Sequence, residues 1–317
     1  MLFYNHPSFS YVHFHHHQLA QDFSWKLGFL ALTFSDNRDN FFYYIEYNEK
    51  NHDDDDEEST TPIKRIKFTS PVRNRGNIIA GSCNGLVCLG CNQDVCVFNP
   101  ITREYVILPK VKIDYRDVYR YNFGFGYVSS TNEYKVLVIL VKKTKAEEIY
   151  VYTLGSRREW RNLGNLDFEF EACDWSEPGV FANGAIYWMM GDKCKMIVTF
   201  DLAEEKFCEQ SSPPPLSPGN IWRANWIGVF KGLLLFAAYL CDQGEISYDI
   251  WLLEKKNHNH DKEEGEEHQS LGWRKEFRID VMNSMNLLTV TKSDDVLTMG
   301  SYYIDIYDTK TSKACEV

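Results

Sequence analysis

Short runs of apolar and β-branched residues, bounded by Gly, Asn, Asp or Pro, recur along most of the chain. Clear examples run from Tyr134 to Leu140, from Ile149 to Leu154 and from Ile197 to Leu202. Runs of this length and composition are typical of β-strands. Beyond residue 70, no stretch of about 12 residues keeps the 3.6-residue apolar period of an amphipathic helix. The pattern therefore predicts an all-β chain.

Three dipeptides separate neighbouring apolar runs in the manner of hairpin turns. They are Asn84-Gly85, Asn183-Gly184 and Lys231-Gly232. Two-residue hairpin turns need positive φ, which Asn and Gly tolerate at low cost. We therefore expect tight antiparallel hairpins at these three places.

The strands recur in units of about 50 residues. Each unit has an apolar strand that ends in an aromatic residue, then a polar turn, then a second aromatic beside charged residues, as in Phe98 to Tyr105 and Phe200 to Phe207. The anchoring aromatics of successive units are 48 to 56 residues apart, at Phe98, Tyr152, Phe200, Trp251 and Tyr307.

Each complete unit is predicted to hold four strands. In the unit around Tyr152 these are 124–127, 134–140, 149–154 and 159–163, and in the unit around Phe200 they are 180–183, 185–190, 196–202 and 206–210. Four strands repeated at this interval are typical of propeller blades, which bury their faces against one another. We predict a kelch-like β-propeller of six blades, the first and last incomplete. A β-sandwich is the structural alternative.

The net charge of -11 is concentrated in two segments, Asp53 to Glu58 and Glu254 to Glu267, which carry nine of the eleven net negative charges. The second segment lengthens a turn of an otherwise regular repeat. We therefore expect acidic loop insertions at 48–61 and 254–269, and a nearly neutral propeller body. A nucleic-acid partner is not expected, because binding phosphates requires a basic surface.

The amino-terminal residues lack the charged and apolar regions of a signal peptide. The longest apolar run, Ile227 to Leu240, spans 14 residues and contains Lys231, whereas a membrane helix needs about 20. An odd number of cysteines, nine, favours reduced thiols over a disulfide framework. We expect an intracellular protein, cytoplasmic or nuclear, with no membrane partner.

A set of motifs in fixed order resembles the F-box-associated domain of plant F-box proteins. The motifs are Gly81 to Leu89, Phe98 to Glu104 with Leu108-Pro109, Gly124 to Tyr127 with Glu133 to Leu137, Gly179 to Trp188, Phe200 to Phe207, and Tyr248 to Leu252 with Trp273 to Lys275. The resemblance implies a kelch-like propeller that binds a target polypeptide for a Skp–cullin–F-box ubiquitin ligase. The target would then undergo ubiquitin-dependent degradation.

In that family the domain follows an F-box, a helical module that docks on a Skp-type adaptor. Residues 1–25 resemble only the segment that follows an F-box, and residues 26–317 resemble the propeller domain. We therefore expect a target protein as partner, and do not expect this chain to recruit a Skp-type adaptor itself. The alternatives are a truncated decoy that binds a target without delivering it, and a propeller lectin or enzyme.

Three groups of residues have the spacing of metal ligands. The first three members of Cys83, Cys88, Cys91 and Cys96 match plant-type iron–sulfur ferredoxins, but all four lie on or beside apolar strands, where cysteine acts as a small buried residue. The other groups are His13, His15, His16 and His17, which could bind zinc, and His258, His260 and Asp261, which could bind a divalent ion. Solvated segments are the preferred interpretation of both histidine groups, and no metal or cofactor is assigned.

Histidine placement argues against an enzyme. None lies between His52 and His258, so a serine or cysteine nucleophile there would lack its usual base. The adjacent carboxylates Glu147-Glu148 and Glu204-Glu205 would point to opposite faces of a strand.

Gly124-Phe-Gly126 lacks the third glycine of a phosphate-binding loop. No catalytic residue is therefore assigned. Partner-binding residues are not identified by the sequence. The candidates are aromatics near predicted loops, namely Tyr119, Tyr121, Trp222 and Trp226.

Overall fold

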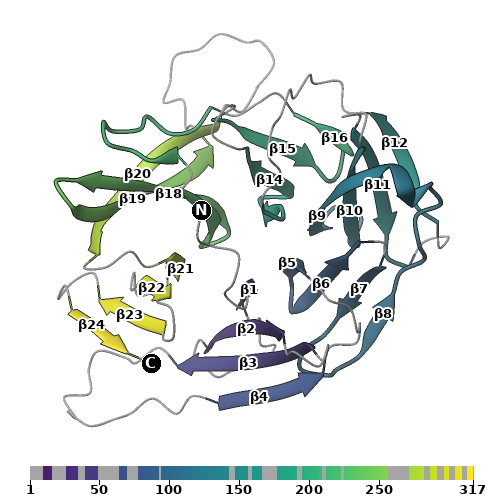
Figure 1. The fold of residues 1–317 in the computed structure, drawn as a ribbon, viewed down its shortest axis with the longest axis horizontal. Helices are drawn as coiled ribbons and strands as arrows, with labels where there is room; N and C mark the ends of the chain where they lie inside the picture. Colours follow the sequence, from purple (N-terminus) through teal and green to yellow (C-terminus); the bar gives the residue numbers. More distant parts are fainter. Residues whose placement is uncertain are drawn as a thin grey trace. The chain divides into compact units, whose positions relative to one another are not determined.

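The structure is a computed structural model of the 317-residue chain (Figure 1). It describes backbone and side chains for residues 78–92, 94–142, 148–155, 159–165, 177–190, 195–208, 212–222, 225–254 and 271–280, and the backbone alone for the remaining strands.

The described strands form six sheets of four, each built from strands consecutive in sequence. In the first three sheets the strands are β1 (Ser10–His15), β2 (Lys26–Phe34), β3 (Asn40–Asn48) and β4 (Lys64–Thr69); β5 (Ile78–Cys83), β6 (Leu86–Cys91), β7 (Asp94–Phe98) and β8 (Tyr105–Ile107); and β9 (Val118–Val128), β10 (Glu133–Lys142), β11 (Glu147–Thr153) and β12 (Arg161–Asn165). The 3-10 turn η1 (Tyr115–Asp117) precedes β9.

The last three sheets follow the same order. Their strands are β13 (Val180–Ala182), β14 (Ala185–Met189), β15 (Ile197–Asp201) and β16 (Lys206–Phe207); β17 (Trp226–Phe230), β18 (Leu233–Asp242), β19 (Glu245–Lys255) and β20 (Leu271–Val281); and β21 (Asn286–Val290), β22 (Val296–Met299), β23 (Ile304–Asp308) and β24 (Lys313–Glu316). The prediction of an all-β chain with four strands in each repeat is confirmed.

The first and last sheets also have four strands each, so the expectation that these two units would be incomplete is wrong. β1 pairs with residues Leu27 to Leu32 of β2. The sequence pattern did not predict this strand, because His13 and His15 stand where other strands carry apolar residues. β1 also falls within residues 1–25, which we assigned to the segment that follows an F-box.

The three predicted hairpin turns have the expected backbone. Both residues of each pair have positive φ: 49° and 77° at Asn84-Gly85, 50° and 80° at Asn183-Gly184, and 51° and 79° at Lys231-Gly232. These values fit the two-residue turns that match the twist of flanking strands. Local sequence therefore determines these three hairpins.

The two predicted acidic insertions fall between paired strands. β3 ends at Asn48 and β4 begins at Lys64, while Lys255 of β19 pairs with Leu271 of β20. The residues between these strands lie outside the described part of the chain. So do all histidine side chains, including both groups considered as metal ligands.

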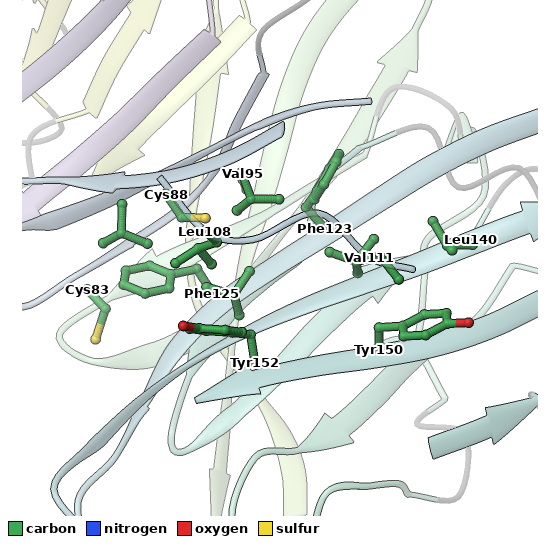
Figure 2. Packing of buried hydrophobic residues seen from close by; sticks show 14 residues of the cluster. Cys83, Cys88, Val95, Leu108, Val111, Phe123, Phe125, Leu140, Tyr150 and Tyr152 are labelled. Carbon is green, nitrogen blue, oxygen red and sulfur yellow. The ribbon is translucent and has the colours of Figure 1, made fainter. Parts of the chain in front are cut away.

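The chain divides into two compact units. The first comprises residues 1–169, 177–186 and 202–205, and the second comprises residues 170–176, 187–201 and 206–317. One apolar cluster of the first unit packs the β5–β8 sheet against the β9–β12 sheet (Figure 2). Its members include Cys88, Val97, Phe123, Phe125 and Val138.

In the second unit, one apolar cluster gathers on the β17–β20 sheet around Phe230, Leu235, Tyr248 and Ile250. In both units the inward-facing aromatics and β-branched residues supply the apolar area whose burial drives folding. No helix among the described residues is long and apolar enough to span a membrane.

Candidate protein-interaction surface

The four spaced cysteines lie in the core of the β5–β8 sheet. Cys83, Cys88, Cys91 and Cys96 are all buried, and none forms a disulfide. Burial raises the pKa of the Cys83 and Cys96 thiols to about 12 and, with the nearby Asp94 carboxylate, that of Cys91 to about 11. No group of three His, Cys, Asp or Glu residues in the described part of the chain is arranged to hold a metal. Their placement matches their interpretation as small core residues.

One carboxylate of each adjacent pair, Glu148 or Glu205, is bound by cationic side chains. Glu205 binds Lys135 and Arg161, whereas Glu204 is exposed. Glu148 accepts hydrogen bonds from Lys142 and from the Tyr150 hydroxyl, and the side chain of Glu147 lies outside the described part. Glu148 and Glu205 are therefore both held in ion pairs.

Gly126 has a packing role. A Cβ added at this position would lie 2.3 Å from Phe181 and 2.6 Å from Leu202. Only glycine allows these side chains to approach β9 so closely. The second glycine of the Gly124-Phe-Gly126 motif is thus explained by contact between the β9–β12 sheet and the residues around β13.

The four candidate aromatics differ in how far their side chains are exposed to solvent. Trp222 is buried and donates from Nε1 to the Met190 carbonyl at 2.7 Å. Trp226 packs against the β17–β20 cluster, and Tyr121 stacks on Phe123 with ring centroids 6.4 Å apart. Tyr119, by contrast, is 73% exposed. Of the four, only Tyr119 presents most of its surface to solvent.

Exposed apolar side chains gather in one short segment. Five of the seven large ones among the described residues lie between 101 and 119: Ile101, Tyr105, Val106, Ile107 and Tyr119. The other two are Ile221 and Leu271. We call residues 101–119 the β8–β9 segment, since it runs from the turn before β8 to the start of β9.

The turn before β8 is fixed by its own side chains. The Asn99 Oδ1 atom accepts hydrogen bonds from the backbone N–H groups of Ile101 and Thr102 at 2.9 and 3.1 Å. Arg103 then adopts φ 64°, and its N–H donates to the Asn99 carbonyl at 2.8 Å. This arrangement is a self-supported turn that directs Ile101 outward.

The connection after β8 is anchored in the core. Leu108 and Val111 are buried in the cluster shared by the two sheets, as Figure 2 shows. The Trp160 Nε1–H donates to the Pro109 carbonyl, and the Tyr115 hydroxyl donates to the Val111 carbonyl. Two apolar anchors and two hydrogen bonds thus hold a connection that contains only one 3-10 turn.

The β8–β9 segment carries four basic and three acidic residues in an otherwise acidic chain. Asp114 caps η1 by accepting from the Arg116 N–H at 3.1 Å, and its hydrogen bonds with Arg116 hold the pKa of its carboxyl below the usual value. Lys110 Nζ lies 3.5 Å from Asp94, and Lys112 Nζ lies 3.8 Å from Glu159. The side chains of both lysines stay mostly exposed.

Sequence reasoning identified Tyr119 but missed β8. The repeat pattern predicts a packing aromatic at Tyr105, whereas this residue is 58% exposed. The equivalent aromatics Trp160 and Phe207 pack on Tyr152 and Phe200, with centroid distances of 5.3 and 4.9 Å. The missed signal was the uncharged triplet Tyr-Val-Ile in the last strand of a repeat.

Three curated relatives are F-box proteins of Arabidopsis thaliana. The chain is 28% identical to F-box protein CPR1 over 206 residues, which cover 56% of this chain and 49% of that protein. It is 29% identical to F-box protein At3g07870 over 205 residues, covering 55% of this chain and 47% of that protein. It is 24% identical to F-box/kelch-repeat protein At3g23880 over 183 residues, covering 56% and 49%. The chain thus spans about half the length of these relatives.

Among solved structures, dihydro-heme d1 dehydrogenase NirN in complex with DHE is similar at a TM-score of 0.38 and 13% identity, covering 90% of this chain and 56% of that one. A similarity this low carries no argument. The family described as the F-box associated beta propeller domain matches residues 29–314, which include most of the described strands. The chain therefore belongs to the F-box associated β-propeller family.

Proposed function

We propose that this chain is a protein-interaction module that captures a target polypeptide through the β8–β9 segment. The observation that carries the proposal is the concentration of exposed apolar side chains on a connection that the core holds in place. Exposed apolar patches mark interaction sites, and tyrosine is enriched among residues that dominate binding energy. A pre-ordered segment also loses less conformational entropy when a partner binds.

The proposed outcome of capture is ubiquitylation of the target. The relatives named above are F-box proteins, and the family resemblance implies that an F-box connects such a propeller to a Skp–cullin ligase. The F-box would be supplied in the same polypeptide or by a second protein. This chain would contribute recognition and would make or break no covalent bond.

The described residues support a non-enzymatic role. The buried thiols of the β5–β8 sheet have raised pKa values and so remain protonated, poor nucleophiles at neutral pH. The described carboxylates of the two adjacent pairs are exposed or bound to cations. Neither group resembles the activated nucleophile and base of a hydrolytic site.

Affinity capture with matched variants tests target binding. The purified full chain would be immobilised and exposed to Arabidopsis extract beside a Tyr105→Ala/Tyr119→Ala variant and an Ile221→Ala/Leu271→Ala control. We expect a protein that the wild type and the control retain and the tyrosine variant loses. Binding would then be measured with that protein purified. If every captured protein also binds the tyrosine variant equally, the β8–β9 segment is not the recognition surface.

A second experiment separates delivery from decoy action. The chain would be co-expressed with a Skp-type adaptor, with and without an F-box fused to its amino terminus. Adaptor binding by the fused form alone would support recognition that depends on a separately supplied F-box. Specific glycan binding or turnover in a glycan-array or hydrolase screen would instead support the lectin or enzyme alternative.

A further inference from the structure

The last strand of the β5–β8 sheet has one unpaired edge. β8 pairs with β7 through Phe98–Tyr105, Val97–Val106 and Cys96–Ile107. At its ends, the Glu104 carbonyl accepts from the Asn99 N–H at 2.9 Å, and the Leu108 N–H donates to the Val95 carbonyl at 2.8 Å. In antiparallel strands backbone groups alternate between the two sides. The N–H and C=O groups of Tyr105 and Ile107 therefore point away from β7, and no partner strand lies beyond β8 in the described sheet.

Edge strands usually carry charges that discourage further pairing. Among the last strands of the six described sheets, β8 is the only one without a charged residue. The sequences are Lys-Arg-Ile-Lys-Phe-Thr in β4, Tyr-Val-Ile in β8, Arg-Asn-Leu-Gly-Asn in β12, Lys-Phe in β16, Leu-Gly-Trp-Arg-Lys-Glu-Phe-Arg-Ile-Asp-Val in β20 and Lys-Ala-Cys-Glu in β24. The common protection of an edge is thus missing at β8.

All three side chains of β8 are open to solvent. Tyr105, Val106 and Ile107 are 58%, 46% and 53% exposed. Since successive side chains of a strand point to opposite faces, both faces of β8 offer apolar surface. An added strand would gain backbone hydrogen bonds along the edge and apolar contacts on both sides.

Charges on the two sides of β8 restrict the chemistry of a partner. Exposed Arg103 precedes the strand, and exposed Lys110 and Lys112 follow it. The carboxylate of Glu104 is already a hydrogen-bond acceptor for the Thr102 hydroxyl at 3.1 Å. Asp94 and Glu159 lie 3.5 and 3.8 Å from the two lysines, whose side chains nevertheless stay mostly exposed. Beside the strand itself, three cations face the single carboxylate of Glu104, which favours a ligand with acidic residues beside its apolar core.

We propose that the free edge of β8 accepts an extended segment of the target polypeptide as an added β-strand, with uncharged β-branched or aromatic residues in its core and Asp or Glu at its ends. The proposal rests on the proposed function, and names the binding mode and the chemistry of the target. A second copy of the chain does not fit. Pairing two three-residue strands gives far less than the roughly 800 Å² per partner of a stable interface, and it brings like charges together.

Peptide selection on the full chain tests edge pairing. The probe is a displayed library of random peptides of about ten residues, the length of a long strand. We expect enrichment of peptides with a β-branched or aromatic core and acidic ends. Ile107→Pro removes one outward N–H while leaving the hydrogen bonds to β7, and we expect it to weaken a selected peptide about tenfold. Ile107→Val, the matched control, keeps the edge and should change affinity less than about twofold.

Two further measurements guard against a misfolded variant. Thermal melting of Ile107→Pro must match the wild type, and hydrogen exchange on the unmodified chain must show slower exchange of the Tyr105 and Ile107 amides when peptide is bound.

A Lys110→Glu/Lys112→Glu variant tests the charge preference and should select peptides with basic ends instead. Equal binding to Ile107→Pro, or peptides without acidic ends, overturns the proposal.

The outcomes also separate this inference from the proposed function. If a captured target depends on Tyr119 but not on Ile107, the edge is not the docking element and the chain is still an interaction module. If peptides pair with β8 but no target is captured, edge pairing stands and the proposed function fails.

Discussion

At the scale of single residues, a buried ion cluster joins the β9–β12 sheet to the turn between β15 and β16. Lys135 Nζ lies 2.8 Å from both the Leu202 carbonyl oxygen and Glu205 Oε1, and its side chain is only 7% exposed. Arg161 binds the same carboxylate with two nitrogens. A charge this buried is stable only while its partners remain in place.

Removing the cation should therefore be costly. We expect Lys135→Met to lower the free energy of unfolding by about 3 kcal/mol, because it leaves the Leu202 carbonyl and part of Glu205 unpaired. Lys112→Met, which alters an exposed lysine paired at 3.8 Å, should change it by less than about 0.5 kcal/mol. Urea unfolding of the two variants measures the difference, and equal midpoints would show that the cluster contributes little.

The same ion cluster makes the stability of the fold depend on pH. Hydrogen bonds from Arg161 and, secondarily, Lys135 lower the pKa of Glu205 from its usual 4.5. A carboxyl with a lowered folded-state pKa stabilises the fold above the unfolded value, and this contribution is lost as pH falls. We expect Glu205→Gln to flatten the loss of stability below pH 4.5, as followed by urea unfolding at several pH values. An unchanged acid slope would contradict this assignment.

Burial also determines which thiols react. Cys83, Cys88 and Cys96 have raised pKa values, foremost through desolvation, so they remain thiols at pH 8. Cys208 and Cys241 are only partly buried. We expect iodoacetamide to modify these two before Cys83, Cys88 and Cys96, as peptide mass spectrometry would show. Urea should remove the difference, and early modification of Cys88 in the folded chain would contradict the packing described here.

At the scale of elements, tryptophans at the start of last strands hold neighbouring connections. Trp160 precedes β12 and donates to the Pro109 carbonyl in the β8–β9 segment. Trp273 in β20 likewise donates to the Ser212 carbonyl at 2.9 Å, in the connection after β16. In both places one indole N–H replaces the regular backbone pairing that a connection lacks.

This arrangement predicts local loosening when the indole is lost. We expect Trp160→Phe to speed hydrogen exchange of residues 108–117 and to lower stability by about 1 kcal/mol, since one hydrogen bond is removed while an aromatic ring remains. Trp273→Phe is the matched control, and should affect residues 212–222 instead. Uniform acceleration across both connections would mean that the indoles support global stability rather than individual segments.

The hairpins were predictable from sequence because their cause is local. Asn84-Gly85 and Lys231-Gly232 adopt the predicted backbone because a two-residue turn depends on little beyond its own φ angles. The exposure of Tyr105 was not predictable in this way. Its counterpart Phe207 occupies the same place in its repeat and packs on Phe200, so the difference arises from three-dimensional contacts that the repeat pattern does not encode.

At the scale of the whole molecule, the acidic charge and most of the described exposed apolar side chains are separated along the chain. Two acidic runs account for nine of the eleven net negative charges, whereas the β8–β9 segment has one more basic than acidic residue. The four-strand repeat and the family were apparent from spacing and motifs. Strand β1 of the first sheet was not, because it contains His13 and His15 among its apolar residues.

Deleting both acidic runs tests whether they serve as solvated spacers. We expect replacement of residues 53–58 and 257–269 by short Gly-Ser linkers to leave melting temperature and target binding unchanged. Runs of like charge usually remain solvated. Calorimetry and binding titration measure the two quantities. Loss of binding on deletion of either run would assign it a direct part in recognition.

The most direct test of the central claim is a hydrogen-exchange footprint of the full chain, with and without a captured target. The account predicts slower exchange centred on residues 101–119, with little change around Ile221 and Leu271. Protection confined to other parts of the chain, with residues 101–119 exchanging as fast as in the free protein, would contradict it.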